Sequence, residues 1–80
     1  MPKLEHKVAI VTGAAQGIGK AIADRLAQDD IVVVVADINE AKAQEVAKSL
    51  GGMAVKTDVS KPEDVTNLVK TVMDTYGRID

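Results

Sequence analysis

Hydrophobic and polar residues follow two kinds of pattern along this chain. Short runs rich in β-branched residues predict strands at residues 7–11, 31–36 and 53–57. After each run, apolar residues recur at intervals of three or four, which predicts a helix. The run at 31–36 is apolar throughout, without alternation. That is typical of a strand buried on both faces of a parallel sheet.

Each predicted helix has an apolar face, and two have clear start signals. The first, residues 17–28, carries Ile18, Ile22 and Leu26 on one face. The second should start after Asn39 as N-cap and stop at Gly51-Gly52. The third should start from a capping box over residues 60–63, with Ser60 as the cap, and stop at Gly77. The apolar faces of the second and third helices are Ala43, Val46, Ala47 and Leu50, and Val65, Leu68, Val69, Val72, Met73 and Tyr76.

The element order β-α-β-α-β-α predicts an α/β fold with a parallel sheet and right-handed crossovers. Eighty residues allow one small domain or part of a larger one. The chain has one Tyr, no Phe, no Trp and no Cys, so its core must be aliphatic. A chain of this size buries only about 60% of its unfolded surface. We therefore expect part of a larger domain.

Composition and charge exclude several classes of protein. The chain is 46% apolar and 28% charged, with a net charge of −2, which argues against disorder and against a general nucleic-acid binder. It has no run of roughly 20 apolar residues that could span a membrane. The lack of Cys excludes a disulfide framework and a thiol nucleophile, and the lone His6 makes a metal site implausible. We expect a cytoplasmic protein.

The most informative segment is residues 12–19, Thr-Gly-Ala-Ala-Gln-Gly-Ile-Gly, between the first strand and the first helix. Ligands bind at this end of the strands in open parallel sheets. Gly13 would permit a tight turn, Gly17 would let a pyrophosphate approach the backbone, and Gly19 would let the helix pack closely. The N–H groups at the helix start would then face the anion. The loop therefore predicts a dinucleotide site.

Two common nucleotide-binding loops do not fit these glycines. A P-loop needs Gly at position 14 and Ser or Thr at position 21, and both are Ala here. The common G-x-G-x-x-G fingerprint also fails, because the glycines are four and then two residues apart. For the glycines alone, a tight turn that binds no ligand remains open.

The Thr-Gly-x-x-x-Gly-x-Gly pattern resembles the nucleotide loop of the short-chain dehydrogenase/reductase family. The resemblance runs from Lys7 to Asp80 and includes Asp58-Val59 and the segment 77–80, Gly-Arg-Ile-Asp. It implies a Rossmann-type doubly wound parallel sheet, of which residues 1–80 form the N-terminal part of a single NAD(P)-binding domain, ending before the fourth strand. It also implies an NAD(P)-dependent oxidoreductase that moves a hydride between nicotinamide and an alcohol or ketone.

The resemblance implies a cofactor-binding set of ten residues: Thr12, Gly13, Gln16, Gly17, Ile18, Gly19, Asp37, Ile38, Asp58 and Val59. In this set Thr12 is expected to tie the loop to a neighbouring strand, and Asp58 to accept from the adenine amino group beside Val59. Alternatively, Asp58 is only a turn carboxylate before Ser60.

Asp37 ends the second strand, where a carboxylate would accept from a ribose hydroxyl and repel a 2′-phosphate. NADP-preferring relatives tend to carry a basic residue in the loop or just after this strand, where Gln16 and Ile38 stand here. We therefore predict NAD over NADP. Alternatively, Asp37 only helps to cap the next helix.

The family's catalytic Ser, and its Tyr followed four residues later by Lys, are absent from this sequence. Tyr76 is the single Tyr, and Asp80 stands four residues after it. We therefore predict no catalytic residue within the 80. The resemblance implies that the full-length protein is a homo-oligomer, a dimer or tetramer. Without a fourth strand, the apolar edge of residues 8–11 would be unpaired, so we expect the segment alone to be weakly stable and to associate.

Two other function classes remain to be distinguished. One is a non-catalytic dinucleotide-binding or sensor module on the same fold, since fold alone does not fix function. The other is a methyltransferase that uses S-adenosylmethionine. The glycine spacing and Asp58-Val59 disfavour the methyltransferase.

Overall fold

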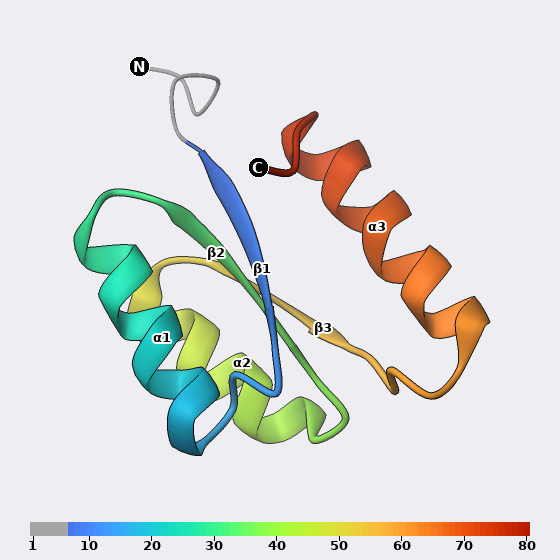
Figure 1. The fold of residues 1–80 in the computed structure, drawn as a ribbon, viewed down its shortest axis with the longest axis horizontal. Coiled ribbons are helices and arrows are strands. Elements are labelled where there is room, and N and C mark those ends of the chain that lie inside the picture. The colour runs from blue at the N-terminus through green and yellow to red at the C-terminus, as the bar shows by residue number, and fades with distance from the viewer. Residues whose placement is uncertain (1–6) are drawn as a thin grey trace.

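The computed structural model describes residues 7–80, which form three strands and three helices in alternation (Figure 1). The elements are β1 (Val8–Thr12), α1 (Gly17–Gln28), β2 (Val32–Asp37), α2 (Glu40–Leu50), β3 (Met53–Lys56) and α3 (Pro62–Tyr76). Every predicted element is present, with strand ends shifted by one residue. Gly51 and Gly77 end α2 and α3 in the left-handed conformation, as predicted. The expectation for His6 lies outside the described residues.

The three strands are parallel and lie in the order β1-β2-β3. Val8 is in register with Val32, and Val34 with Met53. Helices α1 and α2 cover one face of the sheet and α3 covers the other (Figure 1). This is the doubly wound arrangement predicted from the sequence. Because the strands are parallel, the loops that follow β1, β2 and β3 meet at one edge of the sheet.

Strand β2 is buried on both faces. Val33 and Val35 pack in an aliphatic cluster with residues of α1 and α2. Val34 and Ala36 pack in a second cluster with residues of α3. All four are at most 1% exposed. Each fully buried Val contributes roughly 1.5–3 kcal/mol from the hydrophobic effect. The prediction that this strand is buried on both faces is therefore confirmed.

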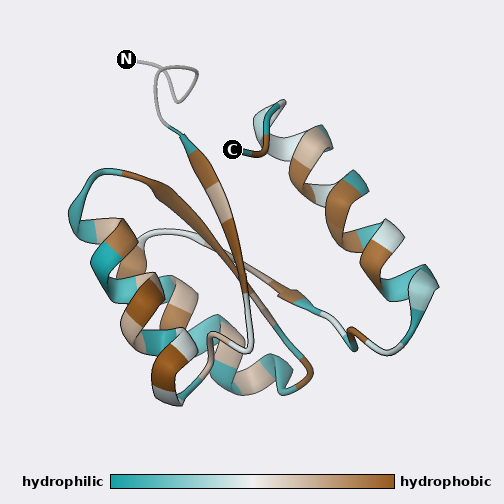
Figure 2. Ribbon diagram, viewed as in Figure 1, coloured by the Kyte–Doolittle hydropathy of each residue, from teal (hydrophilic) through white to brown (hydrophobic). Residues whose placement is uncertain are grey.

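The apolar faces of α1 and α3 are only partly buried. On α1, Ala23 packs against the sheet, whereas Ile18 is 80% exposed and Ile22 is 48% exposed. On α3, Leu68 and Val72 are buried, but the flanking residues Val65, Val69 and Met73 are exposed. Figure 2 shows hydrophobic residues recurring along the ribbons of both helices. The periodicity found the helices, but of the predicted face of α1 only Leu26 packs against the core cluster, together with Ala23 and Ala27.

The helix starts follow the prediction at α2 and depart from it at α3. The Asn39 side chain accepts a hydrogen bond from the Lys42 amide at 3.1 Å and so caps α2 as predicted. The capping box at α3 is wrong, because Lys61 is the N-cap and no side chain caps it. The Ser60 hydroxyl donates instead to Asp58 Oδ1 at 2.6 Å. Lys61 precedes Pro62, a position that disfavours helical backbone, so the helix starts one residue later than a Ser60 cap requires.

No helix within residues 7–80 is both long enough and apolar enough to cross a membrane. The predicted association of the isolated segment remains a prediction. Strand β1 lies at an edge of the described sheet, as that prediction assumed.

Asp80 and Arg78 form a group of hydrogen bonds at the start of β1, and we call this group the carboxylate clamp. The Asp80 amide donates to the Val8 carbonyl at 2.8 Å, and Asp80 Oδ2 accepts from the Val8 amide at 2.9 Å. The Arg78 guanidinium donates to both carboxylate oxygens, from Nε and Nη2, at 2.6 Å each. These bonds, first those of Arg78 and then that of Val8, lower the pKa of Asp80 from 3.8 to about 2. The clamp thus stabilises the ionised carboxylate.

The lowered pKa of Asp80 predicts that acid reduces the stability of the fold. A carboxylate whose pKa is lower in the folded than in the unfolded state stabilises the fold above the unfolded pKa, and this contribution is lost as the pH falls through the folded pKa. We expect the free energy of unfolding of the protein to fall as the pH drops from above 3.8 to about 2. Urea unfolding at successive pH values measures this dependence.

In Asp80→Asn, the fall over the same pH range should be smaller. Asp74→Asn is the matched control, because Asp74 forms only an exposed ion pair with Lys70 at 3.4 Å, a kind of pair worth about 0–1 kcal/mol. It should follow the unsubstituted protein. An Asp80→Asn variant with the same pH dependence as the unsubstituted protein would contradict this role of the clamp.

Candidate functional site

A hollow of about 330 Å³ opens at the edge of the sheet where the three strands end. Its volume is within the range of small-molecule sites. It is lined by Thr12, Gly13, Ala36, Asp37, Ile38, Thr57, Asp58 and Val59. Six of the ten residues predicted from the sequence therefore meet here. The other four, Gln16, Gly17, Ile18 and Gly19, lie at the start of α1.

The glycine loop between β1 and α1 requires glycine for two different reasons, a left-handed backbone and a close backbone contact. Gly13 and Gly17 have φ values of +66° and +64°, a conformation that favours glycine. No atom lies within 4 Å of where a Gly17 Cβ would stand, so this part of the backbone is open to a ligand. A Cβ at Gly19 would lie 2.2 Å from the Gly13 carbonyl oxygen. Only glycine lets α1 start this close to the end of β1, which is the packing role predicted for Gly19.

The start of α1 has features that suit an anion. Gln16 is the N-cap, but no side chain bonds to the first N–H groups, and the first turn has no acidic residue. These N–H groups have no partner within the helix and carry a partial positive charge. In contrast, Asn39 caps α2, and both α2 and α3 have acidic residues in their first turns. Of the three helix starts, that of α1 therefore has the charge and the free N–H groups that best suit an anion.

The Asp37 carboxylate is bonded on both oxygens. Oδ2 accepts from the Ala15 amide at 3.1 Å, and Oδ1 accepts from the Asn39 amide at 3.0 Å. Asn39 is the N-cap of α2, and Asp37 bonds to the amide of that cap residue, so Asp37 does help to hold the start of the helix, as in the alternative interpretation. Asp37 is also one of the residues that line the hollow.

Asp58 is held ionised in the turn after β3. Its Oδ1 accepts from the Ser60 hydroxyl at 2.6 Å and from the Ser60 amide at 3.0 Å, and these bonds lower its pKa. The Asp58 amide in turn donates to Asp64 Oδ2 at 3.0 Å. Beside these polar groups, Ile38 is 60% exposed and Val59 is 65% exposed, so both give the hollow apolar walls.

Sequence reasoning missed two residues of the hollow, Ala36 and Thr57. Thr57 is 3% exposed, and its hydroxyl donates to the Val55 carbonyl at 3.1 Å. Its amide donates to the Asp37 carbonyl at 3.0 Å. Its place at the end of the third predicted strand, directly before Asp58, was the signal that could have identified it.

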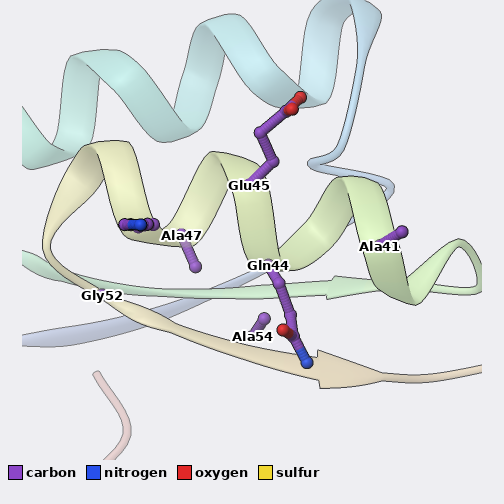
Figure 3. Close-up of a pocket in the computed structure, with 7 residues that line it drawn as sticks. Ala41, Gln44, Glu45, Ala47, Gly52 and Ala54 are labelled. Carbon is purple, nitrogen blue, oxygen red and sulfur yellow. The ribbon is translucent and has the colours of Figure 1, made fainter.

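A larger hollow, of about 570 Å³, lies between α2 and β3 (Figure 3). Gln44 extends from α2 toward β3 there, while Glu45 points away from the strand. Its lining residues are Ala41, Gln44, Glu45, Ala47, Lys48, Gly52 and Ala54. None of the ten predicted residues is among them. Residues 7–80 also contain no group of three or more His, Cys, Asp or Glu placed to hold a metal ion.

Comparisons with known proteins place the chain in a family. The sequence profile of the family described as short chain dehydrogenase matches residues 7–80. Tropinone reductase-like 1 from Erythroxylum coca is 48% identical over 80 residues, which are 98% of this chain and 29% of that protein.

Solved structures agree in fold. The 3-ketoacyl-(acyl-carrier-protein) reductase from Brucella melitensis, complexed with NADH, superposes with a TM-score of 0.91 and 39% identity over 96% of this chain and 33% of its own. The NADPH-dependent reductase YwfH, involved in bacilysin biosynthesis, superposes with a TM-score of 0.88 and 26% identity over 95% of this chain and 35% of its own.

The chain thus spans about a third of the length of these relatives. The parallel sheet, the helices on both faces and the agreement with these structures confirm the expected Rossmann-type fold. With a match over nearly all of its length, the chain belongs to the short-chain dehydrogenase/reductase family.

Proposed function

We propose that the full-length protein is an NAD-dependent oxidoreductase that transfers a hydride between nicotinamide and an alcohol or ketone. Residues 1–80 would be the N-terminal part of its single NAD(P)-binding domain. One observation carries this proposal: the uncapped start of α1 lies beside a hollow whose walls come from the ends of all three strands. The relative from Brucella melitensis was crystallised with NADH, which supports a dinucleotide as the ligand.

The residues fit the parts of a dinucleotide in order. The N–H groups of Gly17, Ile18 and Gly19 would receive the pyrophosphate, with Gln16 beside it as N-cap. The adenosine would lie in the hollow between Ile38 and Val59. The nicotinamide, when bound, supplies the hydride chemistry.

Polar contacts would fix the adenosine end. The Asp37 carboxylate would accept from ribose hydroxyls, and Asp58 would accept from the adenine amino group. Thr12 and Gly13 form the side of the hollow next to β1. Residues 7–80 hold one tyrosine, Tyr76, which packs against the core on α3. The proposal therefore assigns proton transfer and substrate binding to other parts of the full-length protein.

The charge of the hollow supports NAD over NADP. Asp37 and Asp58 both line it, and no Lys or Arg is among its lining residues. A 2′-phosphate would bring a further negative charge next to Asp37 without a cation to pair with. The relatives include both an NADH complex and an NADPH-dependent reductase, so the preference rests on these residues. The cytoplasmic location and the homo-oligomer also remain predictions.

Binding and turnover of the full-length protein test the proposed function. We expect saturable NADH binding by calorimetry, and NADH formation when NAD is mixed with a panel of secondary alcohols. Binding without any turnover would favour the non-catalytic sensor instead. Displacement of NADH by S-adenosylmethionine would favour a methyltransferase, and the absence of NADH binding would contradict the proposal.

Cofactor preference gives a quantitative prediction. NADH should bind at least about tenfold more tightly than NADPH, since loss of one charge-assisted hydrogen bond corresponds to about 1.5–3 kcal/mol. Ile38→Arg places a cation directly after β2 and should tighten NADPH binding by about tenfold. Gln44→Arg adds the same charge in the hollow between α2 and β3 and should leave both affinities unchanged. Equal affinities of the unsubstituted protein for the two cofactors would refute the preference.

Two glycine substitutions separate site geometry from general stability. A Cβ at position 19 would lie 2.2 Å from the Gly13 carbonyl oxygen, and one at position 52 would lie 2.0 Å from the Val33 carbonyl oxygen. Gly19→Ala and Gly52→Ala should each lower the free energy of unfolding by about 1–3 kcal/mol. Only Gly19→Ala should also weaken NADH binding, by about tenfold or more. Equal losses of affinity in the two variants would contradict the assigned role of the loop.

A further inference from the structure

The side chain of Asp37 joins two segments that are remote in sequence. Its Oδ2 accepts from the Ala15 amide in the middle of the glycine loop at 3.1 Å. Its Oδ1 accepts from the Asn39 amide in the turn into α2 at 3.0 Å. The carboxylate therefore bridges the loop that precedes α1 and the turn that precedes α2.

The loop has few other ties to β2. Within the described residues, two hydrogen bonds join residues 13–16 to the end of this strand. One runs from the Gly13 amide to the Ala36 carbonyl at 2.8 Å, and the other is the bond from Ala15 to Asp37. The first is made by the backbone alone. The second depends on the side chain at position 37.

Burial makes the second bond important. Ala14 is 0% exposed and Ala15 is 6% exposed, so water has little access to the Ala15 amide. Without the carboxylate, that amide would be left as a donor with no partner, which is unfavourable in a buried position. The loop would then have to rearrange so that the amide reaches water.

We propose that Asp37 is a positioning residue for the glycine loop, in addition to any contact with the ribose. By holding the Ala15 amide, it fixes the backbone that leads into the start of α1. This inference rests on the proposed function only in giving the loop a ligand. A carboxylate oxygen has more than one acceptor site, so Asp37 can keep its amide partners and still accept from ribose hydroxyls. Removal of Asp37 should therefore weaken binding of the whole dinucleotide.

Hydrogen exchange in the ligand-free, full-length protein tests the bridge directly. In Asp37→Ala, the Ala15 amide should exchange at least about tenfold faster than in the unsubstituted protein, because its protecting acceptor is gone. Asp58→Ala is the matched control, since Asp58 bonds to Ser60 and not to the glycine loop. It should leave Ala15 exchange unchanged. Amides of β2 report in each variant whether the core is intact.

Asp37→Asn is the second variant, in case Asp37→Ala does not fold. Its side-chain oxygen can accept from either amide, but its NH₂ group cannot replace the second acceptor. At least one of the Ala15 and Asn39 amides should therefore exchange faster. Unchanged exchange of both amides in the variants that fold would overturn the proposal.

A binding comparison separates positioning from direct ribose contact. The probes are NADH and the NADH analogue that lacks both the 2′ and 3′ hydroxyls of the adenosine ribose. If Asp37 positions the loop, Asp37→Ala should weaken both probes, and the analogue by about fivefold or more. If Asp37 acts only on the ribose, the analogue should bind equally to both proteins, which would overturn the proposal. If the unsubstituted protein binds neither probe, the proposed function fails, and hydrogen exchange alone decides the role of Asp37.

Discussion

Strand β2 has no face open to water, and the rest of the structure depends on that constraint. Val33 and Val35 need cover on one side, and Val34 and Ala36 need it on the other. Helices α1 and α2 supply the first cover and α3 supplies the second (Figure 1). Parallel strands joined by helices on both faces must end at the same edge. The hollow forms at that edge, because three loops from distant parts of the sequence end there together.

Carboxylates bonded to backbone amides hold these loops in shape. Asp37 accepts from amides before α1 and α2, Asp58 accepts from Ser60, and Asp64 accepts from the Asp58 amide. Each bond satisfies a donor that secondary structure leaves unpaired. Of these carboxylates, Asp37 and Asp58 line the hollow and make it negative, which suits hydroxyl and amino donors better than a phosphate. The start of α1, in contrast, has no acid in its first turn, so its partial positive charge is not offset by a side chain there.

Sequence reasoning succeeded where the signal is local or periodic. The unbroken apolar run of β2 predicted its burial on both faces, and the glycine spacing predicted the close approach at Gly19. It failed at Ser60, which suited a cap, because Lys61 before Pro62 is extended and the helix therefore starts one residue later. Sequence reasoning also failed where the answer depends on how the elements pack in three dimensions. Periodicity groups Ile18 and Ile22 on one face but does not tell whether anything covers that face.

The hydrogen bond between the Ala15 amide and Asp37 joins residues 22 positions apart, and no local sequence pattern predicts it. Thr57 was missed for a related reason, since its role comes from the alignment of strand ends in the sheet. The ten predicted cofactor residues nonetheless fall in two adjoining places, the hollow and the start of α1. Family resemblance identified them as a set, and the parallel sheet accounts for their coming together.

A crystal structure of the full-length protein with NADH is the most direct measurement of the proposed binding mode. It should place the pyrophosphate at the N–H groups of Gly17–Gly19 and the adenosine between Ile38 and Val59, with Asp37 next to the ribose. A dinucleotide bound elsewhere, for example in the hollow between α2 and β3, would contradict the proposed binding mode.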